Sequence, residues 1–300
     1  VAGLPNGFDI YANMGEMDNK GVDANLEYQT RIGNKVGLRL FGNLTYSKNK
    51  IVFRDEPAMQ YAYQKSEGTR YGEFYGYIAE GYFQSEEEIK KSPRQMRELA
   101  PGDIKYKDLN DDGVIDANDQ CYLGKSWFPS WSYGMGFNIN YHNFDLALFF
   151  QGVSDVSIMA NGGSIDTGNG DWGASGVGIV PFTGMGLNPS NVITKALDRW
   201  TADNPRADAW YPRMTANATT NDNNYVNSTH WLKDGSYLRL KQASLGYTLE
   251  NKKLMDKGIE YLYFYLSGQN LLTFSKFKLW DPELGSNGAK YPLSRMVTLG

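Results

Sequence analysis

The sequence has little of several residue types on which common functional sites depend. Its single cysteine, Cys121, excludes an internal disulfide framework and a cysteine-based zinc site. With two histidines, His142 and His230, neither a histidine-rich metal centre nor a Ser–His–Asp triad is expected. The 300 residues include 30 basic and 34 acidic side chains, and this net charge of −4 argues against a nucleic-acid partner. No run of about 18 apolar residues is present, which excludes a transmembrane helix.

Aromatic residues and glycine are abundant instead. The chain contains 21 Tyr, 14 Phe, 7 Trp and 33 Gly, whereas an ordinary protein of this length has about 21 glycines. Two classes share this composition. One is a secreted β-sandwich, and the other is an outer-membrane β-barrel, whose strands carry aromatic residues at both membrane interfaces.

Alternation of apolar and polar residues with a period of two predicts β-strands along much of the chain. In residues 130–141, tryptophan, tyrosine, methionine and isoleucine side chains share one face, and the other face holds serine, glycine and asparagine. Similar strands are predicted at 21–30, 36–51, 144–151, 237–249 and 261–273, with a last one from about residue 294. Arg239 and Lys241 fall in phase with Leu245, which predicts a β-bulge near them.

The predicted connections alternate between short and long. Short turns follow Ile32, Tyr141 and Leu249, whereas long segments occupy about residues 53–129, 155–235 and 274–293. A soluble sandwich has no reason to collect its long loops at one end. An outer-membrane barrel does, with short periplasmic turns, long extracellular loops, a polar lumen and an apolar lipid face. The sequence therefore predicts an all-β antiparallel barrel segment with its C-terminus in the periplasm.

Two short helices are predicted inside the long loops. Ser85 and Glu88 have the spacing of a capping box, in which each side chain accepts a hydrogen bond from the other residue's backbone N–H. Residues 191–201 have apolar side chains at helical spacing and end before Asn204-Pro205.

Enzyme motifs are absent from the sequence. Residues 168–173 match a dinucleotide fingerprint by letter, but this segment neither follows an apolar strand nor opens a helix. Neither His-Glu-x-x-His nor Gly-x-Ser-x-Gly occurs. We therefore predict that the chain is not an enzyme.

Residues 108–119 match a twelve-residue calcium loop at every constrained position except the last, where aspartate replaces glutamate. Gly113 occupies the sharp turn, and Ile115 is expected to anchor the loop to the protein. Oxygen ligands with several carboxylates favour calcium, with magnesium possible. The flanking segments look extended, so we predict a structural clip. The alternative is an acidic turn without an ion. The predicted ligands are Asp108, Asn110, Asp112, the Val114 carbonyl, Asp116 and Asp119.

The long loops also carry large aromatic side chains whose flat faces can pack against a sugar ring. The candidate substrate-binding residues are Trp172, Trp210, Tyr211 and Trp231. Packing within the loops is the alternative role for each.

Several short segments together form a characteristic series. They are GEMDNKGVD at 15–23, PGDIKY at 101–106 with the calcium-type loop, DGSYLRLK at 234–241, LGY at 245–247, GQNLL at 268–272 and DPE at 281–283. This series resembles the SusC/RagA-like TonB-linked outer-membrane proteins of Bacteroidetes. The segments follow the order expected for this family and span nearly the whole chain.

The resemblance implies TonB-dependent import of large nutrients across the outer membrane of a Gram-negative cell. It also implies a SusD-like surface lipoprotein as partner, which we expect to meet the loops at 53–129 and 155–235, and contact with TonB through an N-terminal region. Barrels of this kind have 22 strands and a plugged lumen. Residues 1–300, with about seven strands and no recognisable plug, are therefore expected to form the C-terminal barrel portion.

The nature of the nutrient is left open, with a glycan favoured over a peptide because of the loop aromatics. The rival to an importer is a secreted, calcium-dependent carbohydrate-binding sandwich, and an outer-membrane enzyme is a third alternative.

Overall fold

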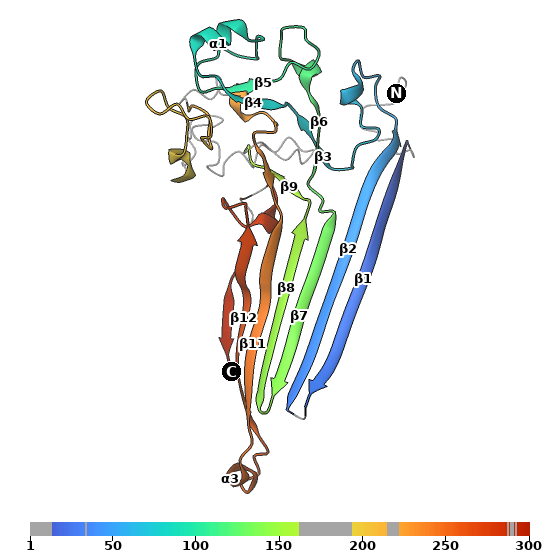
Figure 1. The fold of residues 1–300 in the computed structure, drawn as a ribbon, viewed down its shortest axis with the longest axis vertical. Coiled ribbons are helices and arrows are strands. Elements are labelled where there is room, and N and C mark those ends of the chain that lie inside the picture. The colour runs from blue at the N-terminus through green and yellow to red at the C-terminus, as the bar shows by residue number, and fades with distance from the viewer. Residues whose placement is uncertain are drawn as a thin grey trace, which may run out of the picture.

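The computed structural model describes residues 14–33, 35–161, 194–214, 222–286, 288, 291 and 293–300. Its dominant element is a seven-stranded sheet in the order β1-β2-β7-β8-β11-β12-β13, in which all neighbours are antiparallel (Figure 1). Its strands are β1 (Gly15–Ile32), β2 (Val36–Arg54), β7 (Trp131–Tyr141), β8 (Phe144–Ser154), β11 (Tyr237–Leu249), β12 (Leu262–Ser275) and β13 (Met296–Leu299). This confirms the predicted all-β antiparallel class.

The register keeps the apolar residues of successive strands on one face. Leu26 pairs with Gly42, which pairs with Met135, which in turn pairs with Phe150. Because side chains alternate between faces along a strand, the neighbouring row of Glu27 and its partners lies on the opposite face. Leu26 is 76% exposed and Met135 48% exposed. The apolar face is thus uncovered.

A β-bulge interrupts β11 where the alternation of the sequence is irregular. The pairing of β11 with β8 and with β12 shifts between Leu240 and Gln242. Lys241 is the extra residue relative to β8, whereas on β12 two residues, Asn270 and Leu271, stand opposite it. The predicted bulge is confirmed.

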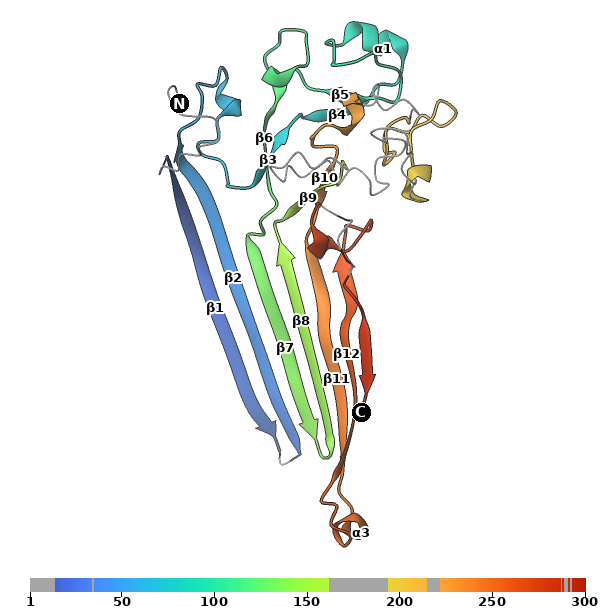
Figure 2. The ribbon, with the colours of Figure 1, turned by 180° about the vertical axis from the view of Figure 1, so that it is seen from behind.

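Tight turns and long connections lie at opposite ends of the sheet. His142, in the turn between β7 and β8, has a φ of 52°, a conformation that non-glycine residues seldom adopt. The β11–β12 connection contains helix α3 (Lys252–Met255) and projects past the other turns, as the view from behind also shows (Figure 2). The long connections gather beyond the other end (Figure 1).

The described parts of the first two long connections pack together. They form the two-stranded sheets β3–β6, β4–β5 and β9–β10. Buried aromatic and aliphatic residues from both, including Tyr106 and Trp231, form one core. The elements here are η1 (Ala62–Gln64), β3 (Glu73–Gly76), β4 (Ala79–Tyr82), α1 (Glu86–Lys91), β5 (Ile104–Tyr106), η2 (Ala117–Asp119), β6 (Cys121–Ser126), β9 (Ser157–Met159), η3 (Thr194–Leu197), α2 (Asp222–Tyr225) and β10 (Leu232–Asp234).

The two predicted loop helices differ from the structure in detail. Ser85 Oγ accepts from the Glu88 N–H, but the Glu88 carboxylate accepts from the N–H of Gln84 instead of Ser85. The helix predicted at 191–201 is wrong over its described part, which holds only the short turn η3. Trp200 N–H donates to the carbonyl of Tyr211, and this cross-chain pairing takes the place of a helical bond. Within the described residues, no helix is long and apolar enough to cross a membrane.

Candidate functional site

Hydrogen bonds from backbone N–H groups to side-chain oxygens shape the acidic loop at 108–119. Asp108 Oδ2 accepts from Gly113 N–H at 2.8 Å, and Asp112 Oδ1 accepts from Val114 N–H at 2.9 Å. Asn110 and Asp116 accept in the same way from the residue two positions later. Gly113 has a φ of 81°, a conformation in which a Cβ is strained. The backbone therefore makes the sharp turn that the sequence pattern predicts.

Asp119 closes this loop from within. Its side chain is fully buried, with Oδ1 accepting from Leu109 N–H at 2.7 Å and Oδ2 from Asp116 N–H at 2.9 Å. Both of its oxygens thus serve the backbone at the start and the end of the loop.

The loop is anchored to its surroundings. Ile115 is buried, and its N–H donates to the Arg94 carbonyl at 2.8 Å, while Arg94 N–H donates to Gly113 at 2.9 Å. Strand β5 ends two residues before Asp108, and strand β6 begins two residues after Asp119. The predicted extended flanks are confirmed, and they tie the loop to two small sheets.

The side chains of the acidic loop are not drawn to a common point. Within the described residues, no three His, Cys, Asp or Glu side chains are grouped so as to hold a metal ion. However, Asp108 Oδ1 is buried without a hydrogen-bond partner. A buried carboxylate oxygen without a donor is unfavourable, so this atom is free to act as a ligand.

The four aromatic residues predicted to bind substrate have different environments. Trp172 lies outside the described residues. Tyr211 and Trp231 are both fully buried, with their ring centroids 5.7 Å apart, and Trp231 Nε1 donates to the Asn224 carbonyl. These two rings pack the loop core and present no surface to a ligand. Trp210 packs edge-to-face on both of them but keeps part of its own surface exposed.

His230 lies beside this aromatic cluster and does not form a catalytic arrangement. Its Nε2 is 3.2 Å from the Trp210 carbonyl and 3.4 Å from the Tyr82 hydroxyl. Burial, together with the nearby Lys233 ammonium, lowers the pKa of His230 to about 3. A neutral imidazole among aromatic rings supports packing and does not exchange protons near neutral pH.

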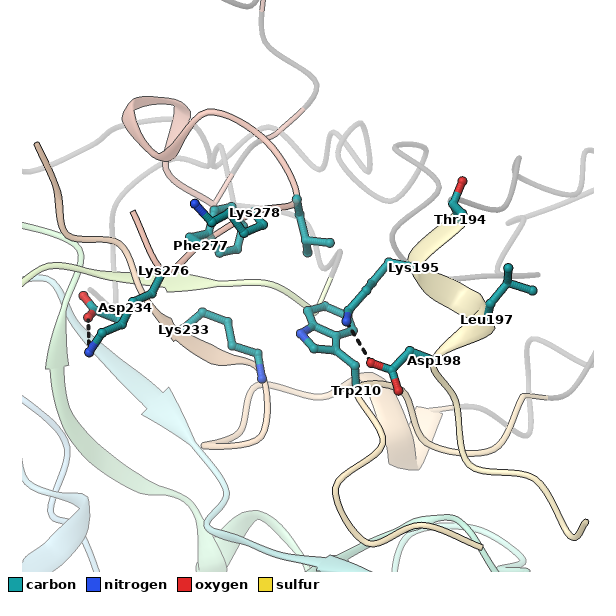
Figure 3. A pocket seen from close by; sticks show the side chains of 11 residues that line it. Thr194, Lys195, Leu197, Asp198, Trp210, Lys233, Asp234, Lys276, Phe277 and Lys278 are labelled. Carbon is teal, nitrogen blue, oxygen red and sulfur yellow. Dashed lines mark hydrogen bonds and ion pairs between the residues drawn. The ribbon is translucent and has the colours of Figure 1, made fainter. Parts of the chain in front are cut away.

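Trp210 lines a cavity of about 640 Å³ between the 194–198 segment, β10 and residues 276–279 (Figure 3). The residues that line this cavity most distinctively are lysines from all three segments. Sequence reasoning missed the site because the lysines are up to 83 residues apart, from Lys195 to Lys278, and form no local motif.

Arg239, on the polar face of the sheet, forms ion pairs with the connection between β12 and β13. One of its guanidinium nitrogens contacts both carboxylate oxygens of Asp281 at 2.6 and 2.7 Å, and another contacts Glu283 at 3.1 Å. The guanidinium also lies 5.3 Å from the Tyr237 ring centroid. The short turn η5 (Pro282–Leu284) is fixed by these contacts.

The sequence is similar to those of known proteins. No family model matches the chain. The chain is 27% identical to "TonB-dependent receptor P3" and 28% identical to "TonB-dependent receptor P26", both of Formosa agariphila, over 96% of its own length. It spans 29% of the length of each of these relatives.

Solved structures show the same fold. The chain superposes on the RagAB peptide transporter with a TM-score of 0.67 at 21% identity, covering 97% of this chain and 30% of that one. The RagAB peptide importer in its closed-closed state gives a TM-score of 0.64 at 22% identity, covering 96% of this chain and 30% of that one.

These findings confirm the predicted resemblance to SusC/RagA-like TonB-linked outer-membrane proteins. The assignment of the chain to the C-terminal barrel portion stays a prediction. The relatives are receptors and transporters, in agreement with a chain that is not an enzyme. They do not favour the carbohydrate-binding sandwich.

Proposed function

We propose that this segment of a TonB-linked receptor forms barrel wall and extracellular loops of an outer-membrane importer of large nutrients. TonB would act through a region outside this chain, and a SusD-like surface lipoprotein would cover the loops. The uncovered apolar face of the seven-stranded sheet carries the proposal, because such a face needs lipid around it.

The height of the apolar face supports insertion in a bilayer. On β2 the face runs from Val36 to Tyr46, and the next side chains on it are Lys48 and Lys50, both exposed. Ten residue steps of about 3.3 Å give about 33 Å along the strand, or about 23 Å when the strand is tilted by about 45°. An apolar band of about 25 Å is what outer-membrane barrels present to lipid.

Spin labels on neighbouring residues test which face meets lipid. In the full-length protein in bilayers, a label replacing Met135 should be relaxed by dissolved oxygen, and one replacing Asn138 by a water-soluble nickel chelate. These residues lie on opposite faces of β7. The reverse pattern, or equal access of nickel to both labels, would contradict a lipid-facing apolar surface.

We expect the SusD-like surface lipoprotein to contact the outer surface of the first two long loops, which share one core. The RagAB neighbours are described as a peptide transporter and importer, and this chain shares their fold. A photocrosslinker replacing the exposed Glu87, in α1, should capture the surface lipoprotein. One replacing the exposed Lys253, in α3 at the opposite end, should not (Figure 1). Crosslinks at Lys253 alone would contradict this orientation.

We also propose that the acidic loop binds calcium as a structural ion. The unpaired Asp108 oxygen supports this, and Asp119 would have to give up a backbone hydrogen bond to reach the ion. Calcium should protect residues 108–119 from proteolysis in the intact protein, and Asp108→Ala should abolish that protection. Asp111→Asn is the matched control, since it removes one charge at a non-ligand position and asparagine tolerates the local φ of 59°. Equal protection in EGTA would contradict the proposal.

A further inference from the structure

The lysine-lined cavity joins three segments that are distant in the sequence. Residues 194–198 form one side, β10 with Trp210 another, and residues 276–279, directly after β12, the third (Figure 3). Its volume of about 640 Å³ lies within the usual range of about 300–1,000 Å³ for ligand sites. A cavity of this volume has room for one or two sugar rings.

The cavity is positively charged although the chain as a whole is acidic. Its lining contains four lysines and two aspartates, a balance of +2, against −4 for the complete chain. Asp198 is already paired with Lys195 at 2.8 Å and with Arg206. Asp234 lies 3.7 Å from Lys276. The lining lysines are Lys195, Lys233, Lys276 and Lys278.

Two of these lysines are left without a carboxylate. Among the residues that the structure describes, neither Lys233 nor Lys278 forms an ion pair. Lys233 Nζ donates to the His230 carbonyl at 2.6 Å and lies 5.1 Å from the Trp210 ring centroid. Burial, and the like charge of Lys195, lower the pKa of Lys233. An ammonium in such a place is stabilised by any anion that enters the cavity.

An apolar surface lies next to the ammonium groups. Trp210, the buried Phe277 and Leu279 contribute it, and Phe277 is fixed by an edge-to-face contact with Trp280 at 4.6 Å. A pyranose ring has an apolar C–H face that packs on such a surface. An acidic sugar therefore carries, on one rigid unit, both features that the cavity complements. An acidic peptide side chain offers the charge without the ring.

We infer that this cavity binds an acidic sugar unit, with its carboxylate or sulfate beside Lys233 and its ring against Trp210, while Lys278, whose ammonium points away from Lys233, adds positive charge to the same cavity (Figure 3). The inference rests on the proposed import of large nutrients and names their chemical class. It assigns Lys233 and Lys278 as the residues that distinguish acidic from neutral glycans.

Calorimetry on the intact, detergent-solubilised protein tests this inference. The probes are a glucuronate-containing disaccharide, a sulfated disaccharide, a neutral disaccharide of the same size and a tetrapeptide of glutamate and glycine. An acidic disaccharide should bind at least tenfold more tightly than the neutral one. Lys233→Met should remove most of this difference, and Lys278→Met a smaller part of it. Lys278 is exposed, so its substitution leaves folding unchanged. Lys90→Met, on the exposed side of α1, should have no effect.

Three results would overturn the inference: equal affinity for acidic and neutral disaccharides, a preference for acidic sugars that survives both lysine substitutions, or tighter binding of the peptide. These measurements need no TonB and no energised membrane. If the protein binds the acidic disaccharide but cells that carry it do not take the sugar up, the result counts against the proposed importer. If cells take the sugar up but the protein shows no binding that depends on Lys233 or Lys278, the result counts against this cavity.

Discussion

Replacing Arg239 by Met should loosen the connection that follows β12. Arg239 is 1% exposed, whereas its partners Asp281 and Glu283 are 20% and 37% exposed. The substitution keeps the apolar stem but leaves two neighbouring carboxylates without a counter-charge. Asp281 also caps η5 by accepting from Glu283 N–H at 3.0 Å. Repulsion between the carboxylates therefore acts directly on this turn.

The size of the effect follows from the burial of the partners. Removing one member of a fully buried ion pair costs about 3–5 kcal/mol. Because water reaches both carboxylates, we expect about 2–3 kcal/mol of local stability to be lost. Arg239→Lys should lose less but still a measurable part, since an ammonium is a single point charge and cannot reproduce the guanidinium's contacts with both carboxylates.

Amide hydrogen exchange reads this loss where it occurs. The Leu284 and Gly285 N–H groups, which donate to the Asp281 and Pro282 carbonyls, should exchange about 30- to 150-fold faster in Arg239→Met. Lys241→Met is the matched control, because it removes a cation from the same strand. Unchanged exchange in Arg239→Met, or equal acceleration in the control, would refute the reasoning.

Three further predictions concern other parts of the chain. A Cβ at Gly136 would lie 2.4 Å from the Phe41 ring, so Gly136→Ala should reduce folding stability by about 1–3 kcal/mol. On gels, less of the variant should run as heat-stable folded barrel. Gly37→Ala is the control, since its Cβ would have its nearest contact at 3.6 Å and should change neither. Burial lowers the pKa of His230 to about 3 from 6.5, so the unfolded chain binds the proton more readily than the folded chain. The melting temperature should therefore fall as the pH is lowered from 6.5 towards 3. In His230→Gln this fall should be smaller, and an equal fall in both proteins would contradict the reasoning. Burial raises the pKa of the Cys121 thiol, so iodoacetamide should modify it only after denaturation, and rapid native labelling would show that the site opens.

The sheet could be predicted closely because its signals are local. Alternation identifies a strand without knowledge of its partners, and the irregular phase of Arg239 and Lys241 identifies the bulge. The spacing of Asp108 to Asp119 likewise predicts a turn that is shaped by hydrogen bonds from its own backbone to its own side chains. Such features depend on backbone geometry that neighbouring residues determine by themselves.

The loop interior could not be predicted in the same way. Tyr211 and Trp231 are residue types that sugar-binding surfaces use, but segments distant in the sequence bury them completely. The predicted helix at 191–201 does not form over its described part, because the Trp200 N–H donates a hydrogen bond to the Tyr211 carbonyl. Lys233 and Lys278 line one cavity only because separate loops fold together beyond the end of the sheet. Each outcome depends on contacts between residues far apart in the chain.

The strands do not all extend equally far at the end of the sheet that carries the long connections. Strand β2 continues for eight residues beyond Tyr46, to Arg54, which adds about 26 Å along the strand at about 3.3 Å per residue. This extension belongs to the β1–β2 pair alone, because Tyr46 pairs with Trp131, the first residue of β7, and Trp131 pairs with Ser154, the last residue of β8. The edge of the sheet is therefore uneven: one side rises beyond the apolar band, and the connections after β8 and before β7 leave the lower side directly. In the proposed importer, a branched solute would reach those connections over the lower side.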